Sequence, residues 1–293
     1  SDLTLALRST DGGEVQRLVE VSGVSPSIDE QLRSMEIELA GNLTFDAKLT
    51  GNLWSPNVTG RAESNSVVIK GRNLGSVATD IAADEFGLEL RDGKINAPDG
   101  GNATFAVSVP FNEANKTSVK ADLNGMNAGD LIAALPSFLP DRIRDLTGKT
   151  SGKDDISGLP NNAQGFVTLS AAHGTFAGQA YDTLKADVKF DGTLITASPI
   201  EIAFAGGTMG GTFTLDRKTA DYTLAMTARS MPVPVLIALL PKNYSIPAIA
   251  GTADLTFTVV GKSDRVEIVS INGTGKATGV IVGESNLGDV TFD

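Results

Sequence analysis

Apolar and polar residues alternate with a period of two along most of this chain. Apolar side chains occupy every second position of residues 3–7, 43–49, 184–190 and 255–259. This spacing is typical of strands that bury one face and expose the other. Turn residues rich in Gly, Asn and Asp separate the runs, and no run between them suits a long crossover helix. The pattern predicts a mostly β, antiparallel fold of on the order of twenty short strands.

Two related heptads interrupt this alternation. Residues 130–136 read Asp-Leu-Ile-Ala-Ala-Leu-Pro, and residues 235–241 read Val-Leu-Ile-Ala-Leu-Leu-Pro, an offset of 105 residues. Each is a short apolar run closed by a proline, which cannot continue a helix. Residues 14–19 form a more polar version near the start of the chain. We therefore predict one small helix at each of these three places.

The sequence around the heptads repeats with a similar period. Residues 73–80 are echoed at 181–187 and again at 286–293. Self-similarity at a fixed spacing indicates a repeat architecture. The sequence predicts a single elongated array over 1–293, with approximate repeats 1–117, 118–222 and a truncated 223–293. Because both ends fall inside a repeat, we expect the chain to be a piece of a longer protein.

The composition of the chain argues against several classes of function. The chain has 24 Lys and Arg against 35 Asp and Glu, a formal net charge of −11, which argues against a nucleic-acid partner. It has no cysteine and one histidine, so neither a thiolate zinc site nor another transition-metal site is expected. No apolar stretch reaches the roughly 18 to 20 residues of a membrane-spanning helix. We find no cofactor motif and predict no enzyme activity.

Residues 136–162 are the most polar stretch, and we predict a mobile connecting loop there. Asp154 and Asp155 lie in it without the alternating oxygen ligands and central glycine of a calcium-binding loop. We therefore expect them to be solvated loop charges. His173 stands beside Gly174, where we expect a plain loop histidine and no catalytic role.

An open antiparallel sheet of this size cannot leave its apolar face in water. It must close, stack on another sheet, or wrap around something apolar. The expected inner residues are mainly aliphatic, with few Tyr or Trp side chains for specific hydrogen bonds, which suits a generic aliphatic ligand. The candidate lining residues are Leu43, Phe45, Leu49, Phe105, Val107, Val119, Leu123, Val167, Leu169, Leu184, Val188, Phe190, Ile202, Phe204, Phe213, Leu224, Met226, Leu255, Phe257 and Val259.

Several phrases resemble a known family. The recurring helix heptads, residues 249–257 and residues 174–178 are similar to sequences of the AsmA-like superfamily. Residues 51–60 and the strands that follow to Gly101 resemble the repeats of its member TamB, the translocation and assembly module protein. This resemblance implies a long, curved β-sheet groove that carries phospholipid acyl chains and has no catalytic motif. It also implies a periplasmic protein of a diderm bacterium, anchored in the inner membrane, supporting outer-membrane biogenesis and working with a BamA-type outer-membrane partner.

Two other functions remain open from the sequence. The first is a structural or adhesin-like β-solenoid with a dry interior and no lipid ligand. The second is an enzyme acting on carbohydrate, which would require two carboxylates a few ångströms apart in a cleft. A lipid carrier differs from both because its inner apolar residues contact a ligand instead of one another.

Overall fold

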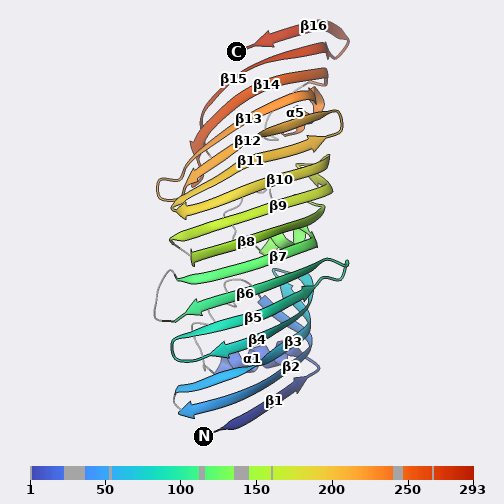
Figure 1. The fold of residues 1–293 in the computed structure, drawn as a ribbon. Coiled ribbons are helices and arrows are strands. Elements are labelled where there is room, and N and C mark those ends of the chain that lie inside the picture. The colour runs from blue at the N-terminus through green and yellow to red at the C-terminus, as the bar shows by residue number, and fades with distance from the viewer. Residues whose placement is uncertain are drawn as a thin grey trace. The chain divides into compact units, whose positions relative to one another are not determined.

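The computed structural model describes residues 2–22, 37–52, 55–111, 116–134, 145–159, 161–239, 247–265 and 267–293. Within them the chain is mostly antiparallel β-structure with three short helices. It divides into two compact units, which we describe separately. Figure 1 draws the strands and helices of each unit. Unit 1 comprises residues 1–140 and 150–160, and unit 2 comprises residues 141–149 and 161–293.

Unit 1 contains two helices and eight of the strands in the described residues. Strands β1 to β7 pair antiparallel in chain order, and β8 lies next to β7. The elements are β1 (Leu3–Ser9), α1 (Gly12–Ser22), β2 (Ile37–Asn52), β3 (Ser55–Ile69), β4 (Arg72–Ala83), β5 (Gly87–Asn96), β6 (Asn102–Pro110), β7 (Thr117–Asn127), α3 (Ala128–Ala134) and β8 (Lys149–Leu159).

Unit 2 has the same kind of antiparallel meander, with one described helix. Each strand from β9 to β15 pairs antiparallel with the next along the chain, ending at β16. The elements are β9 (Ala163–Phe176), β10 (Gln179–Gly192), β11 (Leu194–Phe204), β12 (Gly207–Asp216), β13 (Asp221–Pro232), α5 (Val233–Ala238), β14 (Ile249–Lys262), β15 (Glu267–Val282) and β16 (Ser285–Phe292).

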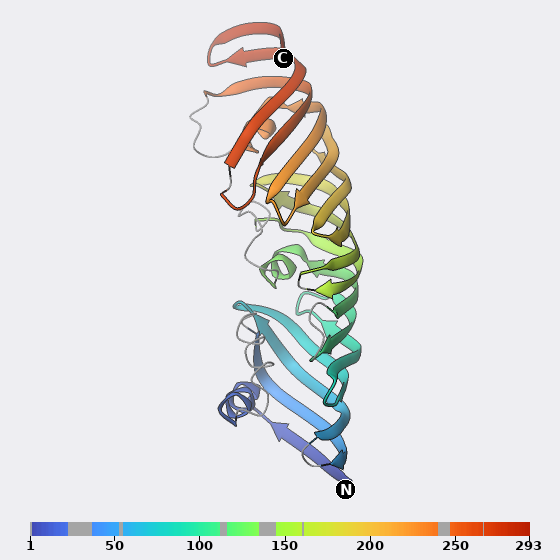
Figure 2. The same ribbon diagram turned by 90° about the vertical axis from the view of Figure 1, so that its left-hand side faces the viewer.

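Bulges bend the strands of both units. The register shifts between Ala40 and Leu43 in β2, and between Leu90 and Gly93 in β5. Gly41 and Asp92, which lie in these shifts, have positive φ angles of 72° and 50°. An extra residue on one strand bends it and increases its local twist. In unit 1, the strands bend toward the side on which α1 lies (Figure 2).

The strands of unit 1 separate an apolar face from a polar face. Phe45 stands opposite Ala62, whereas its neighbour Asp46 stands opposite Arg61. Arg61 forms an ion pair with Asp80 on the next strand at 2.8 Å. Exposed ion pairs of this kind contribute about 0–1 kcal/mol each. Burial of the apolar face is therefore the main source of stability on this sheet.

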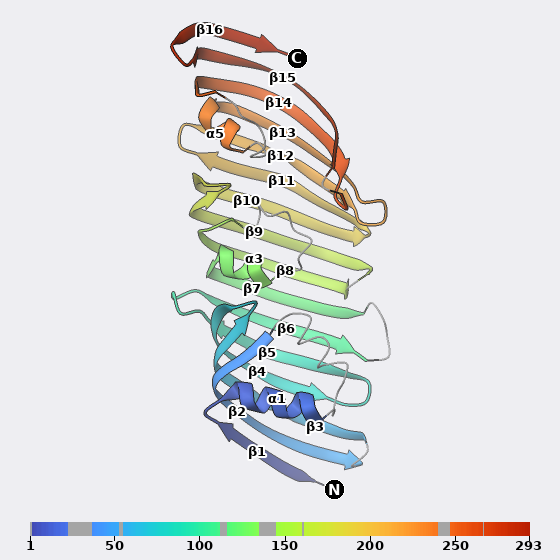
Figure 3. The same ribbon diagram turned by 180° about the vertical axis from the view of Figure 1, so that it is seen from behind.

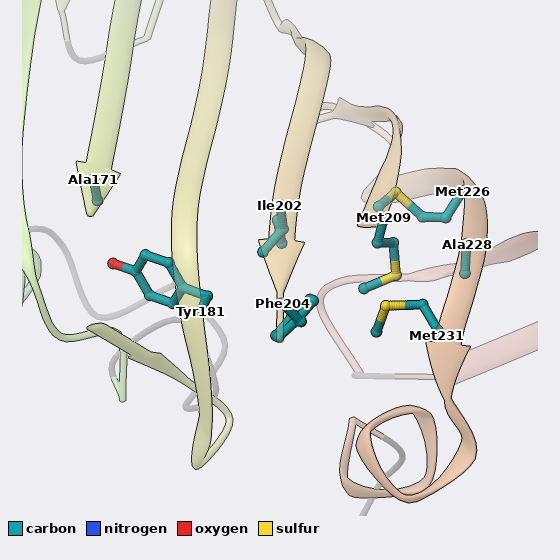
Figure 4. Packing of buried hydrophobic residues seen from close by; sticks show 8 residues of the cluster. All are labelled: Ala171, Tyr181, Ile202, Phe204, Met209, Met226, Ala228 and Met231. Atoms are coloured by element: carbon teal, nitrogen blue, oxygen red, sulfur yellow. The ribbon is translucent and has the colours of Figure 1, made fainter. Parts of the chain in front are cut away.

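In unit 2 the helix α5 covers part of the apolar face (Figure 3). Its side chains Val235 and Leu236, together with Leu239 directly after the helix, pack against a cluster of buried sheet residues. Figure 4 shows these residues, which project from successive strands and include three methionines. The buried members are Ala171, Tyr181, Ile202, Phe204, Met209, Met226, Ala228 and Met231. Flexible thioether side chains fill the irregular space under a short helix.

The structure confirms the mostly antiparallel β-fold with few short helices and corrects other expectations. Sixteen strands occur in the described residues, fewer than expected, and the longest has 16 residues. The three helices lie at the predicted places, although the heptad ends at residues 135–136 and 240–241 lie outside the described residues. Described helices follow β1, β7 and β13. The repeat boundaries stay a prediction.

The loop predicted over 136–162 is wrong for residues 149–159, which form β8. Ion pairs with β7 hold this strand, Lys153 with Asp122 and Lys120 with Asp155, both at 2.9 Å. Residues 149–159 form a strand despite their polar sequence because they pair with a neighbouring strand, and strand propensity depends strongly on such context. Residues 136–144 and 160 lie outside the described residues.

One hydrogen bond of a buried side chain offers a test of the fold of unit 2. Tyr181, which is 2% exposed, donates its hydroxyl to the carbonyl oxygen of Thr147 at 2.6 Å. We expect Tyr181→Phe to lower the free energy of unfolding by about 1 kcal/mol, because the part-buried hydrogen bond between the Tyr181 hydroxyl and Thr147 is lost. Urea unfolding of the variant measures this change. Tyr222→Phe is the control, since that ring is only half-buried, and equal losses in both variants would contradict the assignment.

Candidate functional site: the apolar faces

Rows of apolar side chains cross each unit from strand to strand. Residues directly opposite each other in an antiparallel pair point to the same face, so the register defines these rows. One row of unit 1 consists of Leu5, Ala47, Gly60, Ile81, Leu90, Val107 and Val119. One row of unit 2 consists of Val167, Val188, Ala197, Phe213, Leu224, Val259 and Ile271. Seven strands thus contribute to each row without a charged residue.

All of the candidate lining residues lie on these two apolar faces. The register places Leu43, Phe45, Leu49, Phe105, Val107, Val119 and Leu123 on the apolar face of unit 1. It places Val167, Leu169, Leu184, Val188, Phe190, Ile202, Phe204, Phe213, Leu224, Met226, Leu255, Phe257 and Val259 on the apolar face of unit 2. The sequence pattern therefore identified which side chains share a face within each unit.

Burial is uneven across the apolar face of unit 2. Ile202 and Met226, which belong to the cluster under α5, are 6% and 5% exposed. Leu224 and Val259, farther from the helix, are only half-buried, and Ile271 in the same row is 60% exposed. The described helix therefore covers one end of the face and leaves the other end in contact with solvent.

Unit 1 also has a half-buried apolar face. Leu43 and Ala47 are buried, whereas Phe45 between them and Phe105 on β6 are half-buried. Leu5 on β1 is 41% exposed. Large apolar side chains in a well-packed core are normally almost fully buried. The face has more apolar surface than the described parts of unit 1 cover.

An aromatic ring of unit 1 lies flat on this face. Phe105 stands opposite Gly93, and a Cβ atom at Gly93 would lie only 2.5–2.6 Å from three atoms of the ring. The missing side chain lets the ring lean over the neighbouring strand, so that it does not stand upright. Cross-strand aromatic and glycine pairs of this kind are a known stabilising device in sheets. The ring therefore covers Gly93 and does not project away from the sheet.

Unit 2 uses the same arrangement. Tyr222 stands opposite Gly261, and Phe292 stands opposite Gly275. A Cβ atom at Gly275 would lie 2.6 Å from the ring of Phe292. At Gly261 the closest ring atom of Tyr222 would lie 2.6 Å away. No sequence argument identified these pairs, because the bulges offset the strands and hide which residues stand opposite each other.

Asp154 is the exception to the apolar character of unit 1. Its neighbours Lys153 and Asp155 form ion pairs with residues of β7 that point to the polar face. Asp154 therefore points to the apolar face, where it is half-buried. Burial, the largest cause, raises the pKa of the Asp154 carboxyl, opposed by a backbone hydrogen bond at Ala121. The expectation that Asp154 is a solvated loop charge is wrong.

The described residues show no other arrangement with an obvious chemistry. They contain no group of three or more His, Asp or Glu side chains placed to hold a metal ion. His173 is exposed on β9 with a φ of 51°, so it belongs to a strand irregularity and not to a loop. None of the helices in the described part of the chain is long and apolar enough to span a membrane.

Comparison with other proteins gives no further guide. No protein-family model, characterised protein or solved structure matches this chain. The resemblance to the AsmA-like superfamily therefore rests on the sequence phrases alone. The two apolar faces are therefore the features of this chain that bear most directly on its function.

The raised pKa of Asp154 predicts a pH-dependent stability. The folded state binds this proton more tightly than the unfolded chain, whose pKa is near 3.8. The stability that the folded state gains by binding this proton is therefore fully present below about pH 3.8. It is lost as the pH rises through the pKa of Asp154 in the folded protein. Asp154→Asn removes the cost of ionisation. We expect the variant to be more stable than the wild type at pH 7, and the difference to vanish below about pH 4.

Chemical denaturation between pH 3 and pH 8 measures this difference. Asp155→Asn is the matched control, since Asp155 is ion-paired with Lys120 on the polar face. That variant should show no gain at neutral pH. A wild type and an Asp154→Asn variant with the same stability at every pH would contradict the raised pKa.

Proposed function

We propose that the apolar faces of both units bind the acyl chains of lipids. One observation carries this proposal: each face presents continuous, charge-free rows of apolar residues that the described helices cover only in part. Exposed apolar patches of this extent are rare in monomeric proteins unless they bind something. Acyl chains match them because they need contact and no hydrogen bonds.

The character of the rows supports a lipid more than a polar ligand. Phe213, Leu224 and Val259 offer only hydrocarbon to a ligand. Transfer of hydrocarbon from water to such a surface gains about 25 cal/mol per Å² of apolar area. A polar ligand would lose its hydrogen bonds to water there without replacement. A flat ring such as Phe105 over Gly93 does not project away from the sheet toward a chain bound on the face.

At the level of the whole protein, we propose a role in phospholipid transport between membranes. This rests on the resemblance to the AsmA-like superfamily and TamB. The same resemblance implies that the protein lies in the periplasm of a diderm bacterium and is anchored in the inner membrane. It also implies a contribution to outer-membrane biogenesis and a BamA-type partner. The apolar faces supply the surface on which the acyl chains would travel.

A charge placed on the apolar face tests the proposal. Leu224 is half-buried on the apolar face of β13, and its neighbour Thr223 points to the polar face. We expect Leu224→Asp to reduce the lipid that co-purifies with the protein by roughly tenfold, because an uncompensated carboxylate there repels hydrocarbon. Quantitative lipid extraction after detergent-free purification measures this loss.

Thr223→Asp is the matched control and should retain lipid. Circular dichroism shows whether both variants stay folded, and Phe190→Asp repeats the test on the same face three strands away, on β10. If all acidic variants on the face unfold and the wild type carries no lipid, the faces are an ordinary packed core. That outcome favours a structural β-solenoid and contradicts the proposal.

A second variant changes the shape of the face and leaves its charge unchanged. Gly93→Ala places a methyl group against the ring of Phe105, the nearest group to it. The ring can move away at small cost, and it then projects from the sheet. We expect a folded protein with fewer bound lipids per chain, measured by native mass spectrometry. Gly210→Ala on the polar face is the control, and equal lipid counts in the two variants would contradict the role of the flat ring.

A further inference from the structure

Strand β8 differs from the other strands of unit 1 in what it presents to the apolar face. On β3 and β4, the buried hydroxyls of Ser64 and Thr79 also point to that face. The Ser64 hydroxyl donates a hydrogen bond to the carbonyl oxygen of Ser66 at 3.0 Å. The Thr79 hydroxyl donates one to the carbonyl oxygen of Arg91 at 3.1 Å. Polar side chains on these strands are thus satisfied by the backbone. They present no free hydrogen-bonding group to a ligand.

Two polar side chains on the same face of β8, Thr150 and Asp154, each keep one unpaired atom, although a backbone hydrogen bond at Ala121 also reaches the Asp154 carboxyl. Among the side chains that the structure describes, the buried polar atoms without a hydrogen-bond partner are Thr150 Oγ1 and Asp154 Oδ1. Thr150 is 5% exposed, and both residues alternate onto the same face of β8. Unpaired buried polar atoms are rare in folded proteins and often mark a place where a missing partner binds.

Among the residues that the structure describes, none forms an ion pair with the Asp154 carboxyl. The two nearest lysines along the strands, Lys153 and Lys120, are engaged by Asp122 and Asp155 on the polar face. Ala121 on β7, which has a small side chain, lies beside Asp154. Phe105 on β6 stands opposite Ala121. An ionised carboxylate in such a place is costly unless a donor with positive charge compensates it.

We propose that Asp154 is the polar anchor of the apolar face in unit 1, accepting hydrogen bonds from the primary ammonium headgroup of a lipid. The proposal rests on the proposed function, since the acyl chain of the same lipid lies on the apolar rows. A primary ammonium carries three N–H donors, like a lysine side chain. A quaternary ammonium carries none. The anchor therefore prefers ethanolamine lipids to choline lipids of the same chain length.

A competition experiment tests this preference. The purified protein is incubated with vesicles of equimolar dioleoyl phosphatidylethanolamine and dioleoyl phosphatidylcholine, and the bound lipids are identified by native mass spectrometry. We expect the wild type to be enriched in the ethanolamine lipid by roughly tenfold, the effect of one charge-assisted hydrogen bond. Asp154→Asn should bind both lipids in the offered ratio. Asp155→Asn, altered on the polar face, should keep the preference of the wild type.

The outcomes separate this inference from the proposed function. Equal binding of both lipids by the wild type, or an unchanged preference in Asp154→Asn, overturns the anchor and leaves acyl-chain binding intact. A wild type that takes up neither lipid overturns both. If Asp154→Asn fails to fold, Asp154→Ser provides the same loss of charge in a smaller side chain, and a retained preference in that variant overturns the anchor.

Discussion

The structure depends on the alternation of side chains across an antiparallel sheet. Once successive residues point to opposite faces, each unit acquires one apolar and one polar face, and the apolar face has to be removed from water. The strands of β1 to β7 and of β9 to β16 follow one another in chain order, so the rows extend without interruption within each unit. Those rows form the surface that we propose binds acyl chains.

Partial cover distinguishes these faces from an ordinary core. Under α5 the side chains of Met209 and Met231 are buried, with Met231 at 0% exposed. Away from the helix, the same rows continue through half-buried residues such as Leu224. Bulges and glycines bend the strands and lay rings flat, which keeps the uncovered part of each face smooth. A surface of this kind suits a ligand with a long apolar chain and no fixed shape.

Much of this could be predicted from the sequence, and the failures have physical reasons. Period-two alternation identified the residues that share each face, proline-closed apolar heptads identified α3 and α5, and a more polar version without proline identified α1. β8 was missed because its inward positions, Thr150, Gly152, Asp154 and Ile156, include only one apolar side chain, while pairing with β7 decides its conformation. The pair of Phe105 and Gly93 was missed because a bulge sets their register. Unpaired atoms such as Asp154 Oδ1 follow from tertiary packing alone.

Native mass spectrometry of the wild-type protein, purified without detergent from a bacterial periplasm, tests the central claim most directly. A globular β-protein purified in parallel corrects for lipid that adheres without specificity. Acyl-chain binding by the apolar faces predicts additional masses that correspond to phospholipids and that survive a lipid-free wash. A single mass equal to that of the polypeptide, under the same gentle conditions, would contradict it and leave a sheet whose apolar faces serve only its own folding.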